Sequence, residues 1–232
     1  MDEKITELQQ DLTDYEHIVF LTGAGVSTPS GIPDYRSKGG LYSGHSNPEY
    51  LLSHDNLSEH PDSFYRFVMD NMFYPAAEPN IIHRKMAAIT NEKGWIITQN
   101  VDGLDSKAGA KHLIEFHGNL YDLFCQQCQR KFTYQEYAKS YIHASDGGII
   151  RPRIVLYNES INLDKLSQSA AILSEADLIV LVGTSFRVYP FAQLLNYRNA
   201  LAKIWVINRE PIGEDAELNS IIADATDIFN QI

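Results

Sequence analysis

The sequence predicts an α/β fold: a mostly parallel sheet covered by helices on both faces, with a second, smaller lobe. Three observations predict it. Short apolar runs rich in β-forming residues alternate with helical patterns, glycine-rich turns follow two of these runs, and two long segments interrupt the alternation. Strands that alternate with helices favour a parallel sheet, and such a sheet binds ligands at the carboxyl ends of its strands.

The strands and helices are expected to alternate along the chain. The apolar runs that we interpret as strands lie at 17–21, 95–98, 113–115, 154–157, 178–182 and 204–207. The helical patterns lie at 81–90, 163–174 and 191–201. Near the N-terminus, Ile5, Leu8 and Leu12 recur at helical spacing and should share one face of a further helix.

Two segments break this rhythm, and we interpret them as insertions. Residues 38–74 are expected to form a loop and helices, whereas residues 120–148 carry both cysteines of the chain and no strong helical pattern. We expect the two insertions to form the smaller lobe, and residues 1–37, 75–119 and 149–232 to form the sheet domain. A cleft between two such lobes is a natural place for a substrate.

The composition limits the classes of function. The chain has 232 residues, with 19 Lys and Arg against 30 Asp and Glu, so its formal net charge is −11. This balance argues against a nucleic-acid-binding surface or an anionic membrane as partner, because both need clustered positive charge; it suits partners that present lysines. Without an apolar run near the roughly 20 residues of a membrane span, or the apolar centre of a signal peptide, a cytoplasmic location is expected. The oligomeric state stays open.

A glycine-rich turn follows the first predicted strand. Gly23, Ala24 and Gly25 allow a close approach of the backbone to a pyrophosphate, and Ser27 and Thr28 can cap a helix whose amino end attracts anions. This pattern is typical of a dinucleotide site, although Thr28 replaces the third glycine and no acidic residue follows a second strand about 20 residues on. An ordinary glycine-rich turn explains the same residues equally well.

The next segment, residues 30–42, has the composition of a mobile loop over a ligand. Arg36 could pair with a phosphate or a carboxylate, Asp34 could fix the loop or bind a ribose, and Tyr35 offers a flat face for a ring. A plain surface turn is the alternative.

Polar residues follow the next two predicted strands. Gln99, Asn100 and Asp102 are expected at the carboxyl end of the strand at 95–98, where amides and carboxylates can bind ribose hydroxyls and a carboxamide. His117 follows the strand at 113–115 and can act as a base near neutral pH. A tight turn rich in Asn and Asp, and a structural histidine, are the respective alternatives.

The last two predicted strands also end in residues that suit a nucleotide. Gly183, Thr184 and Ser185 form a second turn that could bind a phosphate or a ribose. Asn208 and Glu210 follow the final strand, and either could bind an adenosine ribose.

The order and spelling of these motifs resemble the sirtuins, the NAD-dependent protein lysine deacylases. The motifs are GAGVSTPSGIPDYR, TQNVDGL, HG, CxxC, RPRIV, GTS and VINRE, and they extend from about Ile18 to Ala225. The resemblance implies a Rossmann-like domain and a small lobe made of a helical and a zinc-ribbon-like module. It also implies NAD as cofactor and acetylated lysines of proteins as substrates.

The resemblance further implies a role for each matching residue. The cofactor-binding set is Gly23, Ala24, Gly25, Thr28, Asp34, Tyr35, Arg36, Gln99, Asn100, Asp102, His117, Gly183, Thr184, Ser185, Asn208, Glu210 and Ala225. Asn100 and Asp102 would orient the nicotinamide ribose, and His117 would be the catalytic base that accepts a proton from a ribose hydroxyl. The acetyl group would pass from lysine to ADP-ribose, with release of nicotinamide.

The acetylated peptide would lie as an added strand between residues 155–159 and 186–189. The implied substrate-binding residues are Val155, Tyr157, Asn158, Glu159 and Val188. Tyr157 and Asn158 stand where the family usually has Phe and Gly, so peptide affinity or acyl preference is expected to differ. Desuccinylating relatives carry a YxxR pair in the small lobe, and the lack of this spacing between residues 39 and 72 favours neutral acyl groups.

The metal ligands depart from the family pattern of two CxxC pairs. Cys125 and Cys128 form one pair. Where the second CxxC pair is expected, the sequence instead has His143 and Asp146 in the pattern HxxD. These four residues could form a tetrahedral zinc site, because all are known zinc ligand types. Alternatively the site has been lost and packing holds the hairpin. The oxygen ligand favours this second alternative, loss or weak binding of zinc.

Two other functions stay open. In the deacetylase reaction that the resemblance implies, the amide oxygen of the acetyl-lysine attacks the ribose carbon as nicotinamide leaves. A mono-ADP-ribosyltransferase would use an acceptor side chain as this nucleophile instead. Some sirtuin-like proteins of this kind lack the active-site histidine, so the presence of His117 disfavours this function. A non-catalytic module that binds NAD or a peptide would not need a base, so the set of Asn100, Asp102 and His117 disfavours this function too.

Overall fold

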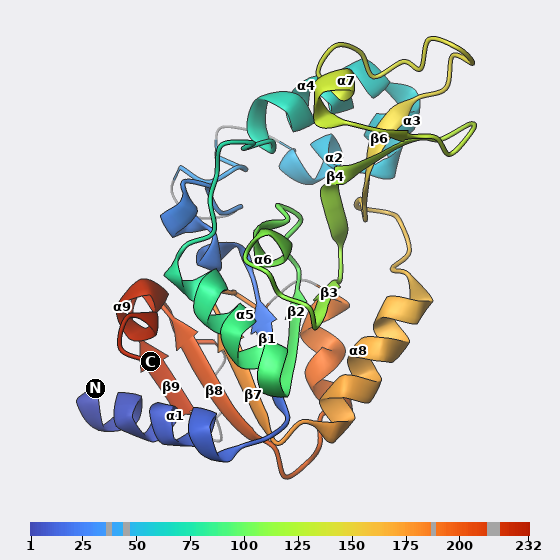
Figure 1. Ribbon diagram of the computed structural model, residues 1–232. Coiled ribbons are helices and arrows are strands. Elements are labelled where there is room, and N and C mark those ends of the chain that lie inside the picture. Colours follow the sequence, from blue (N-terminus) through green and yellow to red (C-terminus); the bar gives the residue numbers. More distant parts are fainter. Residues whose placement is uncertain (36–38, 44–46, 187–188, 213–218) are drawn as a thin grey trace.

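The larger of two sheets has six strands that all run parallel (Figure 1). The computed structural model describes residues 1–35, 39–43, 47–186, 189–212 and 219–232. In chain order the strands of this sheet are β1 (Ile18–Thr22), β2 (Gly94–Thr98), β3 (Leu113–Glu115), β7 (Leu178–Val182), β8 (Lys203–Asn208) and β9 (Asn219–Ile222). Their spatial order is β3-β2-β1-β7-β8-β9, a doubly wound order in which the winding reverses between β1 and β7.

Helices cover both faces of this sheet (Figure 1). One face carries α1 (Asp2–Asp14), α5 (Ile81–Lys93) and α9 (Ala225–Phe229), and the other carries α8 (Leu163–Glu175) and the 3-10 helix η3 (Phe191–Tyr197). Because successive strand residues point to opposite faces, Phe20 packs in the first of these two cores and Leu21 in the second. All five residues of β1 are buried, as expected of a parallel strand covered on both sides.

A second, antiparallel sheet lies in the upper part of Figure 1 and has the strand order β5-β4-β6. Its strands are β4 (Gly118–Cys125), β5 (Lys131–Phe132) and β6 (Ile150–Ile154). The helices that accompany it are α2 (Pro48–Leu51), α3 (His54–Glu59), α4 (Pro61–Asn71) and α7 (Tyr134–Tyr137). They share a separate core that includes Leu57, Phe64, Leu123 and Tyr137. The predicted α/β fold with a mostly parallel sheet is confirmed.

Two predicted elements are wrong. Residues 154–157 do not form a strand of the large sheet, because the strand in this region is β6, which pairs with β4 and ends at Ile154. The chain then turns toward the helices of the small lobe, where Tyr157 bridges to Ser53. The helix expected at 191–201 is a 3-10 helix that ends at Tyr197. Beyond it, the Asn199 side chain accepts a hydrogen bond from the Leu201 amide, which competes with helix continuation.

The division of the chain into a sheet domain and a small lobe at 38–74 and 120–148 stays a prediction. The pairing of β6 with β4 assigns residues 150–154 to the small sheet rather than to the large one. Strands β4 and β9 were not predicted from the sequence, because polar residues interrupt the apolar pattern in both.

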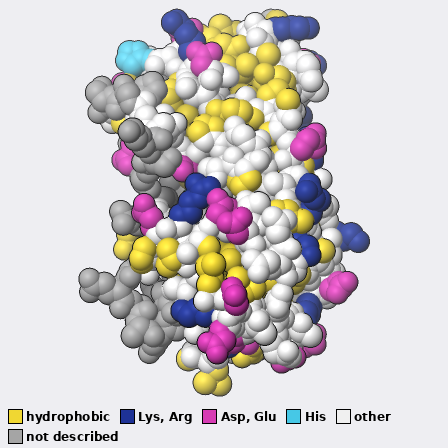
Figure 2. All heavy atoms as spheres, turned by 90° about the vertical axis from the view of Figure 1, so that its left-hand side faces the viewer, with side chains coloured by type: hydrophobic (Ala, Val, Ile, Leu, Met, Phe, Trp, Pro, Cys, Tyr) yellow, Lys and Arg dark blue, Asp and Glu magenta, His cyan; other side chains and the backbone are white. Residues whose placement is uncertain are grey.

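The surface of the described residues carries charges of both signs. On the face shown in Figure 2, Lys and Arg side chains lie interspersed with Asp and Glu side chains, and hydrophobic side chains gather over its upper part. No helix among the described residues is both long and apolar enough to cross a membrane.

Candidate functional site

A cavity of about 610 Å³ opens where the winding of the large sheet reverses. Its walls come from the carboxyl ends of β1, β2, β7 and β8, from the segment after β6, and from the start of α9. Doubly wound sheets bind ligands at this place, because the loops that follow the two central strands lead away in opposite directions. The strand order therefore sets the position of the cavity.

Most of the predicted site residues line this cavity. Those in its wall are Ala24, Gly25, Thr28, Asp34, Tyr35, Gln99, Asn100, His117, Val155, Tyr157, Asn158, Glu159, Gly183, Thr184, Ser185, Asn208, Glu210 and Ala225. Gly23 contacts the site through its carbonyl oxygen, which accepts a hydrogen bond from Asn100. Asp102 lines a small adjoining recess together with Asn100. Arg36 and Val188 lie outside the described residues.

The turns after β1 and β7 require glycine because their backbones touch. The Gly25 amide donates a hydrogen bond of 2.8 Å to the Gly183 carbonyl oxygen. A Cβ atom on Gly25 would lie 2.7 Å from this oxygen, and one on Gly183 would lie 2.7 Å from the Val26 nitrogen. Gly183 also has a φ of +58°, which residues with a side chain rarely adopt. Packing thus accounts for these glycines, and it leaves bare backbone in the cavity wall.

Ser27 connects two of the predicted polar residues. Its hydroxyl donates to Asp102 Oδ2 at 2.7 Å and accepts from Asn100 Nδ2 at 3.3 Å. Asn100 is only 5% exposed, and its Nδ2 also donates to the Gly23 carbonyl oxygen at 3.1 Å. Both bonds use the amide nitrogen, and the carboxamide oxygen has no hydrogen-bond partner among the described residues. Burial raises the pKa of Asp102, opposed by hydrogen bonds from the Leu104 amide and Ser27.

A second histidine lies behind Ser27. His83, on α5, is fully buried, and its Nδ1 accepts a hydrogen bond of 3.3 Å from the Asn80 amide. Burial lowers the pKa of His83 to about 4, so the imidazole is neutral at neutral pH. Its proton is then on Nε2, which lies 3.4 Å from the Ser27 hydroxyl and donates to it. His83 therefore leaves the Ser27 proton directed at Asp102, a connection that the sequence did not predict.

The base predicted from the sequence is held in one tautomer. His117 Nδ1 lies 3.2 Å from the carbonyl oxygen of Gln99, so Nδ1 carries the proton and Nε2 holds the lone pair. Burial lowers the pKa of His117 and the charge of Lys165 lowers it further, against the effect of the hydrogen bond to Gln99. A neutral imidazole with an unprotonated nitrogen, placed in a cavity wall, is suited to accept a proton.

A chain of hydrogen bonds joins the ends of β2, β7 and β8. Gln99 Nε2 donates to Thr184 Oγ1 at 2.6 Å, and Asn208 Nδ2 donates to the Thr184 carbonyl oxygen at 3.2 Å. Arg209 and Asp224, which pair through a salt bridge, also line the cavity; Arg209 directly follows β8. The sequence did not predict this pair, because the two residues belong to different elements.

An ion pair holds the segment that follows β6. Arg151, itself only 5% exposed, donates to both carboxylate oxygens of Glu159, at 2.5 and 3.1 Å. Glu159 also accepts a hydrogen bond of 3.0 Å from the Leu156 amide. Asn158 has a φ of +68°, and its side-chain amide donates to Asp55 on α3 at 2.9 Å. The segment predicted to flank a peptide is thus fixed at two points.

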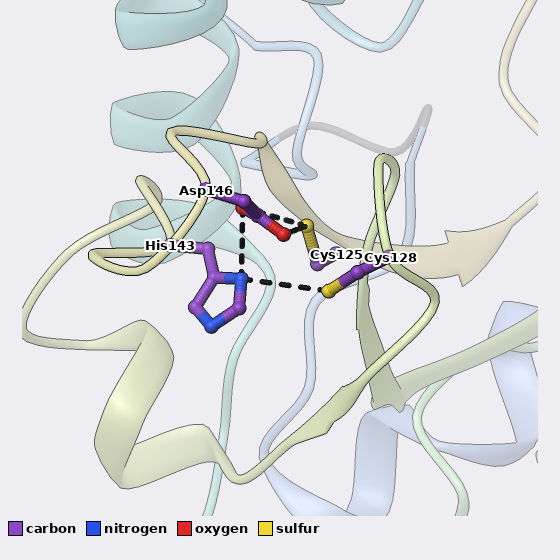
Figure 3. A group of neighbouring side chains, drawn as sticks. All are labelled: Cys125, Cys128, His143 and Asp146. Carbon is purple, nitrogen blue, oxygen red and sulfur yellow. Dashed lines mark hydrogen bonds and ion pairs between the residues drawn. The ribbon is translucent and has the colours of Figure 1, made fainter.

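The four predicted metal ligands form a cluster in the small lobe (Figure 3). One ligand atom from each lies within 4.8 Å of all the others. Cys128 Sγ is 3.5 Å from His143 Nδ1, and Cys125 Sγ is 3.6 Å from Asp146 Oδ1. Zinc bonds of about 2.3 Å to sulfur and about 2.0–2.2 Å to nitrogen or oxygen place such pairs roughly 3.5 Å apart in a tetrahedron. The residues therefore fit a zinc ion, and the clustering favours zinc binding over loss of the site.

Comparisons with known proteins give the same family over most of the chain. The model described as the Sir2 family matches residues 23–190. An NAD-dependent protein deacetylase of Listeria monocytogenes serotype 4b (strain F2365) is 54% identical over 98% of this chain and 100% of its own length. A protein of the same name from Lactiplantibacillus plantarum is 49% identical, over 98% of each chain.

Solved structures of Sir2 proteins have the same fold. A complex of Sir2 with a p53 peptide and NAD+ has a TM-score of 0.85 at 32% identity and covers 98% of this chain and 96% of the solved one. A Sir2 variant with a deacetylated p53 peptide and 3'-O-acetyl ADP ribose has a TM-score of 0.88 at 32% identity, with the same coverage. Since the family model, the relatives and the solved structures agree, the chain belongs to the Sir2 family.

Proposed function

We propose that this chain is an NAD-dependent protein lysine deacetylase, which transfers the acetyl group of an acetylated lysine to ADP-ribose. The observation that carries the proposal is one cavity, at the reversal of the sheet, that joins His117 and Asn100 to two turns of bare glycine backbone. Relatives in the family are named for this activity. In the balanced reaction, acetyl-lysine, NAD+ and water give lysine, nicotinamide and O-acetyl-ADP-ribose.

The residues of the cavity fit a dinucleotide. The turns at 23–25 and 183–185 offer backbone without side chains, which a pyrophosphate can approach closely. The unpartnered carboxamide oxygen of Asn100, together with Asn208 and Glu210, provides acceptors for ribose hydroxyls. Asp34 and Tyr35, in the loop after β1, also line the cavity and are further proposed NAD-binding residues. When bound, NAD supplies a ribose carbon from which nicotinamide can leave.

We assign the nicotinamide end to the recess that Asn100 and Asp102 line. Ser27 donates its hydroxyl proton to the Asp102 carboxylate, and His83 supports this bond because its ring N–H donates to the Ser27 oxygen. Fixed acceptors in a partly desolvated site favour positive charge that develops on a ribose as its leaving group departs. Asn100 and Asp102 would thus orient the ribose and stabilise the charge.

His117 is the proposed catalytic base. Its Nδ1 is held by the Gln99 carbonyl oxygen, so Nε2 is the atom that would take a proton from a ribose hydroxyl. The deprotonated hydroxyl could then attack the acyl carbon. The rings of Phe116 and Phe191 lie 5.3 and 6.2 Å from the imidazole, centroid to centroid, and shield it from bulk water.

The acetylated peptide is proposed to lie along residues 155–159. The Arg151–Glu159 pair and the Asn158–Asp55 bond fix this segment before any peptide binds, which lowers the entropy lost on binding. Recognition through the backbone would explain tolerance of different sequences around the lysine. Val188, which lies outside the described residues, stays a predicted substrate-binding residue.

We propose that the cluster in the small lobe holds a structural zinc ion. Cys125, Cys128, His143 and Asp146 would be its ligands. The outer partners are already in place: the Ser145 hydroxyl lies 2.6 Å from His143 Nε2, and the Gly148 amide donates to Asp146 Oδ1 at 2.8 Å. Such partners orient ligands and raise metal affinity. With four protein ligands the site would be closed and structural rather than catalytic.

Nicotinamide release from NAD+, measured with and without an acetyl-lysine peptide, tests the proposed function. We expect release only with the peptide, accompanied by an equal amount of O-acetyl-ADP-ribose. His117→Ala should lower kcat/KM by at least about 100-fold, the usual contribution of a general base. His60→Ala is the matched control, because His60 is an exposed residue of the small lobe and should retain activity.

The same measurement separates the alternatives. Release that does not depend on the peptide would point to an ADP-ribosyltransferase or a hydrolase of NAD. No release, with NAD+ still bound, would point to a binding module. If the His117→Ala variant deacetylates as fast as the natural protein, His117 is not the catalytic base.

A further inference from the structure

His117 lies in a short loop that leads from one sheet to the other. The loop joins β3, an edge strand of the large sheet, to β4 of the small sheet (Figure 1). Only Phe116 and His117 separate the two strands. The hydrogen bond from Nδ1 to the Gln99 carbonyl oxygen fixes the ring of His117. The position of Nε2 therefore also depends on what holds the backbone of this loop.

One side chain spans the loop. Asn119 Nδ2 donates to Glu115 Oε1 at 2.6 Å, and Asn119 Oδ1 accepts from the Tyr121 amide at 2.8 Å. Glu115 stands two residues before His117 and Asn119 two residues after it, so their hydrogen bond closes the loop across the proposed base. Because both ends of the Asn119 carboxamide are used, its orientation is fixed. The assigned cofactor and catalytic roles use neither residue.

The closed loop also lies against the turn that carries Asp102. Gly103, the residue after Asp102, has a φ of +74°, and a Cβ atom on Gly103 would lie 3.1 Å from Asn119 Nδ2. The backbone beside Asn119 joins the same region, because the Leu120 amide donates to the Val101 carbonyl oxygen at 2.8 Å. The Asn119 side chain thus contacts both the loop of the proposed base and the turn of the proposed ribose-orienting carboxylate.

The Glu115 end of this bond is anchored in the large sheet. Glu115 is the last residue of β3 and pairs with Thr98 of β2. The Phe116 amide donates to the Thr98 carbonyl oxygen at 2.8 Å, which continues this pairing by one residue. Since the backbone of Glu115 is fixed, its carboxylate gives Asn119 a fixed partner.

We propose that Asn119 and Glu115 are positioning residues: their hydrogen bond holds the loop so that His117 Nε2 stays within reach of the ribose hydroxyl. The inference rests on the proposed function and adds two residues to it. A general base needs a distance of about 2.6–3.2 Å to the proton donor, and a misplacement of about 1 Å can lower the rate roughly 100-fold. Neither residue lines the cavity or its recess, so both would act through His117.

Asn119→Ala tests this assignment. We expect kcat for an acetyl-lysine peptide to fall about tenfold, with little change in the KM of NAD+ or of the peptide, because the loss affects proton transfer rather than binding. Asn91→Ala is the matched control. The Asn91 carboxamide also uses both ends, since it donates to the Gly109 carbonyl oxygen and accepts from the Lys111 amide. Asn91 lies near the end of α5, does not line the cavity and should retain kcat when substituted.

Two substitutions of Glu115 test the same bond from its other end. Glu115→Gln keeps an oxygen that can accept from Asn119, whereas Glu115→Ala does not. Glu115→Ala should lower kcat about as much as Asn119→Ala, and Glu115→Gln should lower it less. Melting temperatures of all variants identify any that fails to fold. Equal losses of kcat in the two Glu115 variants would overturn the role of this hydrogen bond.

Combination with His117→Ala separates positioning from a general structural role. If Asn119 acts through His117, Asn119→Ala should cause no further loss of deacetylation in a protein that already carries His117→Ala. Independent effects would multiply instead. A further loss of about tenfold in the double variant, or an unchanged kcat in Asn119→Ala alone, would overturn the inference.

The imidazole of His117 gives a measurement that needs no turnover. In ¹⁵N NMR spectra of the natural protein, His117 should be a single tautomer with its proton on Nδ1. Asn119→Ala should add the second tautomer, because the ring no longer faces Gln99 in one fixed position, and Asn91→Ala should not. This change in a protein that does not deacetylate the peptide would support the inference and count against the proposed function. Deacetylation in which Asn119→Ala alters neither kcat nor the tautomer would do the opposite.

Discussion

Gly25 and Gly183 approach each other so closely that neither can carry a side chain without moving the other. Their backbones share the 2.8 Å hydrogen bond that joins the turn after β1 to the turn after β7. These two strands flank the reversal of the sheet, so the contact fixes both sides of the proposed pyrophosphate site.

Gly183→Ala should therefore destabilise the protein and weaken NAD binding. The new Cβ would meet the Val26 nitrogen at 2.7 Å, and alanine at a φ of +58° is strained as well. We expect a loss of about 2–3 kcal/mol in the free energy of unfolding, measured by urea denaturation. Gly109→Ala separates the two causes, because Gly109 has a φ of +88° with open space around it. If both variants lose the same free energy of unfolding, the close contact with the Val26 nitrogen does not contribute to the loss.

Glu159→Gln should loosen the segment proposed to bind the peptide. The substitution leaves the buried Arg151 guanidinium without its carboxylate, and losing these hydrogen bonds between charged groups should cost about 1.5–3 kcal/mol of stability. We also expect a higher KM for an acetyl-lysine peptide. Asp122→Asn is a matched control, since Asp122 pairs with an arginine, Arg153, that is half exposed, and its loss should cost less than about 1 kcal/mol.

The pH dependence of stability gives a second check on this pair. Although burial opposes the change, hydrogen bonds from Arg151 and the Leu156 amide lower the pKa of Glu159. A carboxyl group with a lowered pKa stabilises the fold at neutral pH, and the contribution disappears as the pH falls through its folded-state pKa. The difference in the free energy of unfolding between Glu159→Gln and the natural protein, measured by urea denaturation at several pH values, should become smaller as the pH falls. A gap independent of pH would contradict the assigned ionisation.

Deacetylation should stay active to a lower pH than an ordinary histidine base would allow. Activity requires the unprotonated Nε2 of His117, and burial, assisted by the charge of Lys165, lowers the pKa of this residue. The acidic limb of kcat/KM should lie below the usual histidine value of about 6.5.

Lys165→Met should shift that acidic limb to higher pH. The lysine ammonium binds the Glu115 carbonyl oxygen, two residues from His117, and its positive charge disfavours the imidazolium. Removing the charge makes protonation easier, so activity should be lost earlier on acidification. Lys107→Met removes a lysine that instead pairs with Glu78, and its pH profile should match that of the natural protein. A Lys165→Met profile that stays in place or moves to lower pH would rule out this electrostatic effect.

Protein purified without added zinc should contain one zinc ion per chain. Structural zinc contributes directly to folding, so chelation should lower the melting temperature. Asp146→Ala should weaken zinc binding by at least about tenfold in a competition with a chelator. Asp146→Cys should bind zinc more tightly than Asp146→Ala, because it restores a fourth ligand. Metal-free protein with an unchanged melting temperature would refute the site.

Much of the site could be predicted because parallel strands end at one edge of a sheet. The strands that precede Gly23, Gln99, Gly183 and Asn208 are short apolar runs visible in the sequence, and their carboxyl ends meet at the cavity. Prediction failed at residues 154–157, since an apolar run does not reveal which sheet a strand joins. The sequence does contain one indication of the Arg151–Glu159 pair, because a charged residue such as Arg151 inside a buried strand needs a partner.

The sequence by itself determined the parallel sheet, the glycine turns and the identity of the polar groups, because these depend on local composition and strand order. Only the tertiary structure decided the tautomer of His117, the support of Asp102 by Ser27 and His83, and the contact between Asn119 and Gly103. It also decided that His143 and Asp146 meet the two cysteines. Each of these depends on distances between segments far apart in the chain, which packing fixes and local sequence pattern does not.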